Sequence, residues 1–248
     1  MKTVRFSEAC GPEGLRLYAI GDVHGRLDLL EVMHERIASD LQKRPVADFG
    51  IIHLGDYTDR GSDSKGVLDF LVARCESDPR FIALMGNHDE GLLEFLATAD
   101  RDGLFAGNGG EATARSYGVE IDFSSDERAR EGRDALLDAM PEAHIAFLSS
   151  LPRSIAFGDF FFCHAGIRPG VPLDRQDPED LTWIRWDFLD HTGLFEKVIV
   201  HGHTPVARPD IQPNRIDIDT GAFKTGRLTA LVIDGGEKTL IEVSEDQW

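Results

Sequence analysis

Cysteines and basic residues are scarce in this chain, and it has no long apolar run. The three cysteines, Cys10, Cys75 and Cys163, form no CxxC pair and no even-numbered set. This pattern argues against a disulfide framework and against a thiolate zinc site. No apolar run approaches the roughly 20 residues of a membrane-spanning helix, and residues 1–10 lack the apolar segment of a signal peptide. We therefore expect a cytoplasmic protein without a membrane partner.

The shortage of positive charge restricts the partners further. Lys and Arg number 26 against 44 Asp and Glu, which gives a formal net charge of -18. A field of this sign repels duplex nucleic acid, although metal ions can reverse the potential inside one pocket. The hydrophobic share of 42% and charged share of 28% are typical of a globular protein. We expect one domain over residues 1–248.

The first half alternates short apolar runs with helix-like stretches, the pattern of βαβ units. Each predicted strand ends at a glycine followed by a polar residue. Because ligands of open α/β sheets bind beyond the carboxyl ends of the strands, three such ends predict one shared site. The predicted strands cover residues 15–20, 49–54 and 81–85, the predicted helices 27–41 and 67–74, and the turns are Gly21-Asp22, Gly55-Asp56 and Gly86-Asn87.

The second half is organised differently. Residues 160–164, 197–203, 215–219 and 228–234 are predicted strands with few helices between them, which indicates a second, more antiparallel sheet. Between the halves, residues 100–140 are charged, with scattered glycines. We interpret this segment as a partly helical insertion that caps the site, with a solvated helical hairpin that makes no substrate contact as the equal alternative.

Five short blocks contain the residues suited to metal chemistry. Asp22 and His24 lie two residues apart at a strand end, so an extended chain there would direct both to one metal. Asp56 can bridge two metals, and a second metal would be completed by oxygen and imidazole ligands. That second set is Asn87, His164 and His203. The blocks are Gly21-Asp22-Val23-His24-Gly25, Gly55-Asp56-Tyr57-Thr58-Asp59-Arg60-Gly61, Gly86-Asn87-His88-Asp89-Glu90, Cys163-His164-Ala165-Gly166 and His201-Gly202-His203-Thr204.

Two divalent ions on two carboxylates leave a net positive site that suits a phosphate dianion. Such a pair can hold a bridging hydroxide for in-line attack on phosphorus. His88 is the candidate acid for the leaving oxygen, oriented by Asp59. Arg60 has the forked donors that bind phosphate, and Arg185 is a second candidate. His201 is the alternative to His203 as a metal ligand; its other possible role is to hold the ligand residues in place without contacting the metal.

The blocks and their order resemble the GDxHG, GDxxDRG, GNHD/E and final histidine motifs of the calcineurin-like metallophosphoesterases, and most closely the bacterial PPP-type serine/threonine protein phosphatases. The match runs from about Gly21 to Thr204. The resemblance implies a double β-sandwich flanked by helices, a four-layer αββα fold. It implies the same metal ligands, the same acid pair and the same arginines, with manganese as the usual ion and iron, zinc and magnesium as alternatives.

Two departures from the family bear on the substrate. The chain has Asp89 before Glu90 and Ala165 after His164, where eukaryotic members have His-Glu and His-Gly-Gly, and it is short for an extended peptide groove. The first expectation is a serine/threonine protein phosphatase that hydrolyses phosphate monoesters. The alternative is a diadenosine tetraphosphate hydrolase, and a non-catalytic scaffold of the same fold is a third. Phosphopeptides, small phosphoesters and dinucleoside polyphosphates are the expected substrates.

Overall fold

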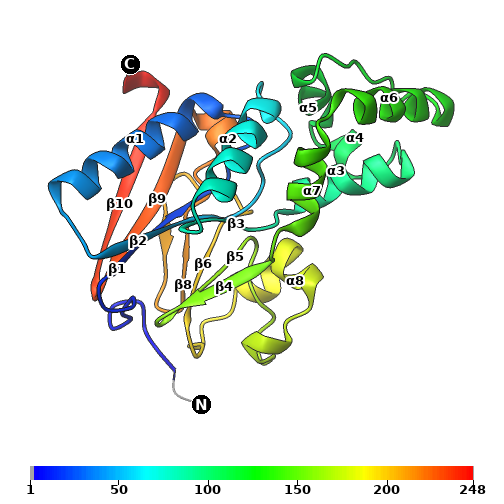
Figure 1. The fold of residues 1–248 in the computed structure, drawn as a ribbon. Coiled ribbons are helices and arrows are strands. Elements are labelled where there is room, and N and C mark those ends of the chain that lie inside the picture. Colours follow the sequence, from blue (N-terminus) through cyan, green and yellow to red (C-terminus); the bar gives the residue numbers. More distant parts are fainter. Residues whose placement is uncertain (1–2, 248) are drawn as a thin grey trace.

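The computed structural model describes residues 3–247, and within them two five-stranded β-sheets lie between helices (Figure 1). The first sheet has the order β10-β9-β1-β2-β3, and the second has the order β4-β5-β6-β8-β7. The strands are β1 Leu15–Ile20, β2 Asp48–His53, β3 Phe81–Ala83, β4 Ser154–Phe157, β5 Phe160–Cys163, β6 Val198–His201, β7 Asp210–Ile211, β8 Arg215–Asp217, β9 Arg227–Asp234 and β10 Glu237–Ser244. The helices are α1 Leu27–Lys43, α2 Ser64–Ser77, α3 Asn87–Thr98, α4 Leu104–Gly107, α5 Gly110–Ser116, α6 Asp126–Ala139, α7 Glu142–Ser150, α8 Pro178–Trp183, α9 Trp186–Leu189 and α10 Ala222–Thr225, with short 3-10 turns at Leu173–Arg175 and Glu245–Gln247.

Strand alternation builds the layers. In β1, Leu17 and Ala19 point toward the second sheet, whereas Tyr18 and Ile20 pack with α1. In β5 the phenylalanines at 160 and 162 face the first sheet, and Cys163 faces the layer of α8 and α9. Both sheets are therefore buried on both faces, as in a helix, sheet, sheet, helix stack. The four-layer αββα fold expected from the resemblance is confirmed.

Parallel pairing gathers the polar strand ends at one edge. β1 pairs with β2, and β2 with β3, all in parallel. The carboxyl ends of these strands therefore lie side by side, and the chain passes directly from them into Asp22, Asp56 and Asn87. The three strand predictions and the edge they share are confirmed.

The second sheet differs from the expectation in two ways. β5, β6 and β8 pair in parallel, and only the outer strands β4 and β7 are antiparallel. Residues 228–234, expected in this sheet, form β9, which pairs antiparallel with β1 in the first sheet. The physical reason is packing: Leu231 and Ile233 alternate with Ala230 and Val232, so β9 has two apolar faces and fits a central position between β10 and β1.

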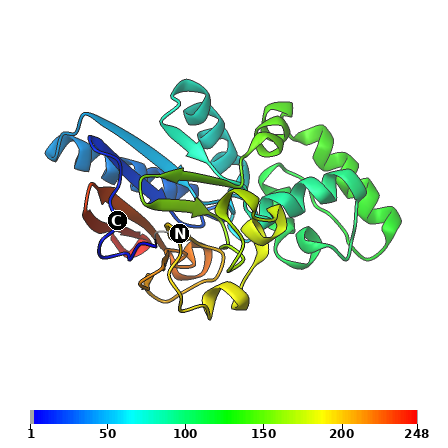
Figure 2. The ribbon, with the colours of Figure 1, turned by 90° about the horizontal axis from the view of Figure 1, so that it is seen from below.

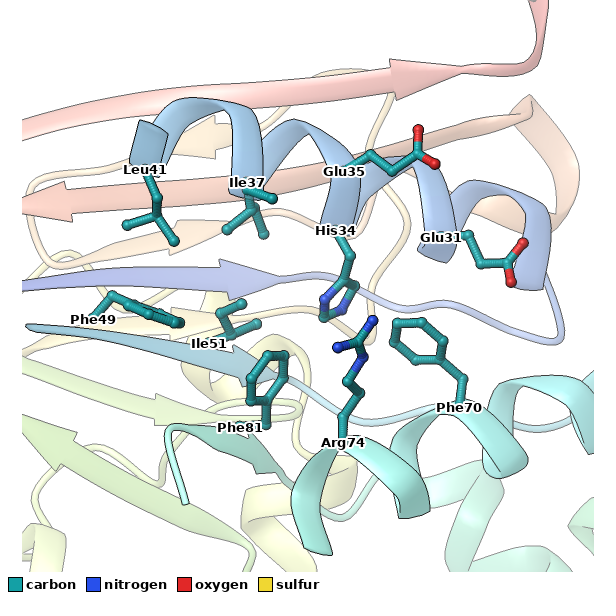
Figure 3. Close-up of a pocket in the computed structure, with 11 residues that line it drawn as sticks. Glu31, His34, Glu35, Ile37, Leu41, Phe49, Ile51, Phe70, Arg74 and Phe81 are labelled. Atoms are coloured by element: carbon teal, nitrogen blue, oxygen red, sulfur yellow. The ribbon is translucent and has the colours of Figure 1, made fainter. Parts of the chain in front are cut away.

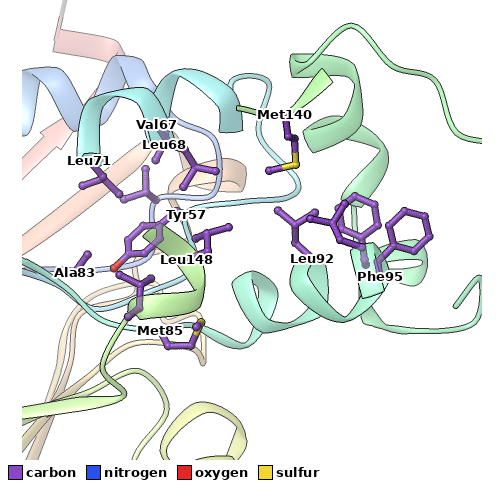
Figure 4. Close-up of a cluster of buried hydrophobic side chains, with 14 of the residues drawn as sticks. Tyr57, Val67, Leu68, Leu71, Ala83, Met85, Leu92, Phe95, Met140 and Leu148 are labelled. Carbon is purple, nitrogen blue, oxygen red and sulfur yellow. The ribbon is translucent and has the colours of Figure 1, made fainter. Parts of the chain in front are cut away.

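The helices α3 to α7 lie to one side of the two sheets, which is clearest from below (Figure 2). They surround an apolar cluster that joins them to α2 (Figure 4). Ala114 of α5 and Leu136 of α6 are buried in this cluster with Leu92 and Phe95 of α3. Residues 100–140 are therefore partly helical, as expected, and they are packed against the body of the protein. Among residues 3–247, no helix is both long enough and apolar enough to span a membrane.

Candidate metal centre

The loops after the strands have an unusual backbone. Within residues 3–247, six non-glycine residues have positive φ, and five of them belong to the predicted site: His24, Asp56, Asp59, Arg60 and His203. A side chain in the left-handed region costs of order 1 kcal/mol per residue, so such residues concentrate where the surrounding structure holds them for function.

Two glycines allow the loops to approach this closely. A Cβ at Gly86 would overlap the backbone nitrogen and a carboxylate oxygen of Asp56, and a Cβ at Gly202 would overlap Oδ1 of Asp22. Both glycines adjoin residues of the predicted site, Asn87 and His203. The glycines in these motifs are thus required by close approach of the loops.

Asp56 lies between two histidines. Its Oδ2 is 3.4 Å from Nε2 of His24, and its Oδ1 is 3.4 Å from Nε2 of His164. Two groups of buried side chains each have potential ligand atoms within 4.8 Å of one another, and Asp56 belongs to both. One group adds His24 and His88, and the other adds His164 and His203. A carboxylate shared by two such groups has the geometry of a bridging ligand.

Hydrogen bonds set which ring nitrogen faces the centre. Nδ1 of His24 donates to the carbonyl oxygen of Thr58 at 2.8 Å, and Nδ1 of His164 donates to that of Leu54 at 3.0 Å. In each neutral imidazole Nε2 then carries the lone pair, and Nε2 is the atom that faces Asp56. A backbone carbonyl behind the imidazole is the usual support of a metal-binding histidine.

The protonation states also suit a cation. Burial lowers the pKa of His24 to about 3 and that of His203 to about 2, and it lowers the pKa of His164 as well. These rings are therefore neutral near pH 7, as a ligand must be. Burial, together with the carboxylates of Asp219, Asp56 and Asp217, raises the pKa of Asp22 well above its usual range. A bound cation would relieve that repulsion.

Two further observations fit a metal at this place. Oδ1 of Asp22 is buried and has no hydrogen-bond partner in the described part of the chain. In the second group, Oδ1 of Asn87 lies 2.9 Å from Nε2 of His164 and 2.8 Å from Nδ1 of His203. Because the proton of His164 is on Nδ1, its Nε2 and the amide oxygen are two acceptors facing each other. Two hydrogen-bond acceptors that face each other with no proton between them can instead act as ligands of a cation.

The proposed acid pair is assembled. Nδ1 of His88 lies 2.7 Å from Oδ2 of Asp59, and both side chains are buried. Burial by itself would lower the pKa of His88, but the carboxylates of Asp56 and Asp59 outweigh it and raise that pKa. The imidazole is thereby kept able to donate a proton near neutral pH.

Both predicted arginines reach the centre, and each contacts a different one of the two metal groups. The guanidinium of Arg60 donates to Nε2 of His24 at 3.1 Å, and it lies 2.8 Å from Nε2 of His88. Nε of Arg185 donates to Nε2 of His203 at 2.9 Å. Two guanidinium groups thus border the cluster of Asp56, where a phosphate group would be bound.

The structure differs from expectation in the first ligand set. The chain is not extended between Asp22 and His24, because His24 has a φ of 46°. Asp22 instead accepts a hydrogen bond from the backbone of His203 at 3.0 Å, and His88 is the third member of the group that contains His24 and Asp56. The ligand role of Asp22 therefore stays a prediction, supported by its unpartnered oxygen.

His201 is not brought to the centre. Its side chain lies on the outer face of the second sheet, with its ring 5.0 Å from that of Phe188, and it belongs to neither metal group. Nδ1 lies 3.1 Å from the carbonyl oxygen of Gly202 and 3.8 Å from Oδ2 of Asp217. This position is compatible with support from behind the site and not with the rival ligand role.

Two buried residues that support the site were missed from the sequence. The carboxylate of Asp89 accepts from the backbone nitrogens of Asp56, Tyr57 and Gly86 at 2.9 to 3.2 Å and so ties two loops together. Its position at the third residue of α3 was a readable signal. The hydroxyl of Thr113 in α5 accepts a hydrogen bond from the backbone N–H of Asp59 at 2.7 Å and donates one to the Asp59 carboxylate at 2.9 Å.

Thr113 and its neighbours give residues 100–140 a place in the site. The carbonyl oxygen of Gly109 accepts from the backbone nitrogen of Arg60 at 3.1 Å, and a Cβ at Gly109 would come within 2.9 Å of that nitrogen. The Asn108-Gly109-Gly110 turn therefore packs directly on the Arg60 loop. No sequence pattern indicated this contact, because it joins segments about 50 residues apart.

A cavity of about 430 Å³ lies elsewhere, between α1 and α2 over β2 and β3 (Figure 3). It is lined by aromatic rings, by His34 and by Arg74. His34 contacts the buried core histidine His53, with their Nε2 atoms 3.0 Å apart. None of the lining residues belongs to the metal groups. The candidate centre is thus separate from this cavity.

Known proteins share both the sequence pattern and the fold. The family model of the calcineurin-like phosphoesterases matches residues 15–227. The asymmetrical bis(5'-nucleosyl)-tetraphosphatase PrpE of Bacillus thuringiensis (strain Al Hakam) is 28% identical over 86% of this chain and 88% of its own length. The protein of the same name from Oceanobacillus iheyensis is 26% identical, with 94% of each chain covered. A crystal structure of a protein proposed to be a diadenosine tetraphosphatase superposes with a TM-score of 0.63 at 22% identity, over 93% of this chain and 94% of that one. The chain belongs to the calcineurin-like phosphoesterase family.

Proposed function

We propose that this phosphoesterase hydrolyses dinucleoside polyphosphates, and that it splits a tetraphosphate asymmetrically into a nucleoside triphosphate and a nucleoside monophosphate. The observation that supports hydrolysis at this centre is the position of Asp56, whose two oxygens face His24 and His164 at 3.4 Å each. We infer that two divalent cations bind there. Manganese is the expected ion, with iron, zinc and magnesium as alternatives.

Six side chains would hold the two cations. Once bound, the cations would supply positive charge to the phosphate oxygens and make a water molecule acidic enough to attack phosphorus. The first ion would be held by Asp22, His24 and Asp56, and the second by Asp56, Asn87, His164 and His203, in the arrangement that the family resemblance implies. The alternative set around His24, in which His88 replaces Asp22, would leave the chain without its acid.

The remaining side chains act on the substrate. Arg60 and Arg185 would donate to the phosphate oxygens and align the reacting group, because their guanidinium groups already contact histidines of the two metal groups. Water oxygen bonds to phosphorus while the bond to the leaving oxygen breaks. His88 gives its Nε2 proton to that oxygen, and Asp59 stabilises the charged imidazole through Nδ1.

The substrate class is supported by the relatives. The two curated relatives described above carry the name of a bis(5'-nucleosyl)-tetraphosphatase and match nearly the whole chain. This similarity favours the alternative that the sequence placed second. The serine/threonine protein phosphatase that the sequence placed first stays a prediction, supported by the order of the five motif blocks.

A substrate panel separates these proposals. The purified chain, supplied with manganese, is compared by kcat/KM on diadenosine tetraphosphate, a phosphoserine peptide and p-nitrophenyl phosphate, with the nucleotide products resolved by chromatography. We expect preference for the dinucleotide and equal amounts of ATP and AMP. Preference for the phosphopeptide would favour the protein phosphatase. No turnover with manganese, iron, zinc or magnesium would contradict the catalytic proposal and favour the scaffold.

A further inference from the structure

We propose that the indole of Trp183 is a stacking platform for a nucleobase of the substrate, next to the phosphate-binding arginine Arg185. This inference rests on the proposed function, since it names the part of a nucleotide that the metal centre cannot recognise. It assigns a role in specificity to a residue that none of the motif blocks contains.

The first argument is exposure. Trp183 is the last residue of α8, and 41% of it is exposed, although it is one of the largest apolar side chains in the protein. Its two chain neighbours, Thr182 and Ile184, are 0% and 7% exposed. A large apolar side chain that stays partly in water between buried neighbours offers surface to a ligand.

The second argument is rigidity. Thr182 donates a hydrogen bond to Glu90 at 2.9 Å, and Glu90 is also bound by Arg153 at 2.6 Å. On the other side, Ile184 packs in the apolar cluster with Phe188. The backbone of Trp183 is therefore held on both sides, so little conformational entropy is lost when a base stacks on its ring.

The third argument is location. The ring of Trp183 lies 6.2 Å from that of His203, at an interplanar angle of 72°. Arg185, two residues further along the chain, donates to the same imidazole. A substrate whose phosphate is held by Arg185 therefore has the indole within reach of the adjoining nucleoside. The ring of Phe223, which lies 5.3 Å from that of His24, is less available, because the guanidinium of Arg60 lies over it at 4.7 Å.

The chain offers a matched control. Trp186 is 67% exposed and follows Arg185 directly, but it lines a surface depression with Arg168 and Asp190 that contains no residue of the metal groups. A general effect of removing an exposed indole near Arg185 would appear in both variants. A stacking contact at the centre would appear only at Trp183.

The test compares a nucleotide with an inorganic phosphate chain of the same length that lacks the nucleoside. Binding of ATP and of inorganic tripolyphosphate to the manganese-supplied protein is measured by titration calorimetry. Wild type should bind ATP more tightly, and Trp183→Ala should weaken ATP binding roughly 5- to 150-fold while leaving tripolyphosphate unchanged. Trp183→Phe should retain much of the preference, and Trp186→Ala all of it.

Three results would overturn the proposal: no preference for ATP in wild type, an unchanged preference in Trp183→Ala, or an equal loss for both ligands in that variant. The last would mean that the indole only shapes the phosphate site. The proposed function is judged separately by the release of AMP from diadenosine tetraphosphate. If the protein prefers ATP through Trp183 but releases no AMP, the proposed reaction is rejected and the stacking role of Trp183 stands. If it releases AMP but shows no such preference, the proposed reaction stands and the stacking role is rejected.

Discussion

Replacing Thr113 by valine tests how residues 100–140 contribute to the site. Valine has nearly the same shape as threonine but lacks the hydroxyl, which accepts the backbone N–H of Asp59 and donates to its carboxylate. Both groups of Asp59 would then be buried without that partner, since Asp59 is 0% exposed. Each buried group left without a partner costs about 1–3 kcal/mol, so we expect a loss of about 2–6 kcal/mol in the free energy of unfolding.

Urea unfolding measures this loss, with Thr113→Ser as the matched control. Serine keeps the hydroxyl and removes one methyl group, which should cost about 1 kcal/mol. The two variants therefore differ mainly in the hydrogen bonds that the hydroxyl makes with Asp59 and Ser64. If Thr113→Val unfolds at the same urea concentration as Thr113→Ser, the hydroxyl does not stabilise the Asp59 loop and the reasoning fails.

The same variant should affect catalysis through His88. Without the hydroxyl, Asp59 is less firmly positioned at Nδ1 of His88. We expect kcat to fall more for a substrate with a poor leaving group, such as phosphoserine, than for p-nitrophenyl phosphate, because only the former depends strongly on the acid. Equal effects on both substrates would argue for a purely structural role of Thr113.

Three further predictions follow from the site. Asp59→Asn removes a carboxylate that raises the pKa of His88, so the imidazole should lose its proton at a lower pH. The alkaline limb of the pH profile of kcat/KM should therefore move to lower pH, and an unmoved limb would exclude the acid pair. Asp56→Asn should lower the metal content found by elemental analysis and reduce activity at least 100-fold, and near-normal turnover with two ions retained would contradict the bridging role. Asp89→Asn should lower the free energy of unfolding in urea by about 1–3 kcal/mol, because one amide oxygen replaces the two carboxylate oxygens that accept from the loop nitrogens. The exposed control Asp138→Asn should stay within about 0.5 kcal/mol of wild type.

Removing metal should also change stability. A ligand that binds only the folded chain raises the unfolding temperature by mass action, so manganese should raise it and a chelator should reverse the effect. Burial lowers the pKa of His24 to about 3 and that of His203 to about 2, so both imidazoles stay neutral at pH 5 and protons should not displace manganese from them between pH 7 and pH 5. Differential scanning fluorimetry at pH 7 and pH 5 tests both expectations. An unfolding temperature that manganese leaves unchanged at pH 7 would contradict a metal site.

Local sequence determined most of the centre. Asp22, Asp56 and Asn87 each follow an apolar run, and parallel strands with short connections must end at a common edge, so the pattern of single residues was sufficient to predict their meeting. His164 and His203 follow strands of the second sheet in the same way. The pair His88 and Asp59 was also proposed from the sequence, because His88 follows Asn87 directly and Asp59 lies in the same block as Asp56.

Only the tertiary structure decided the rest, because those features depend on contacts between segments distant along the chain. The position of β9 beside β1 depends on competition among strands for a central place in the sheet. Which oxygen of Asp56 faces which histidine depends on left-handed loops that close packing imposes. Thr113 reaches Asp59 across 54 residues, and Trp183 is exposed beside His203 because both of its neighbours are buried. Local patterns thus predicted the residues of the candidate centre, and packing determined how they are oriented and which residues support them.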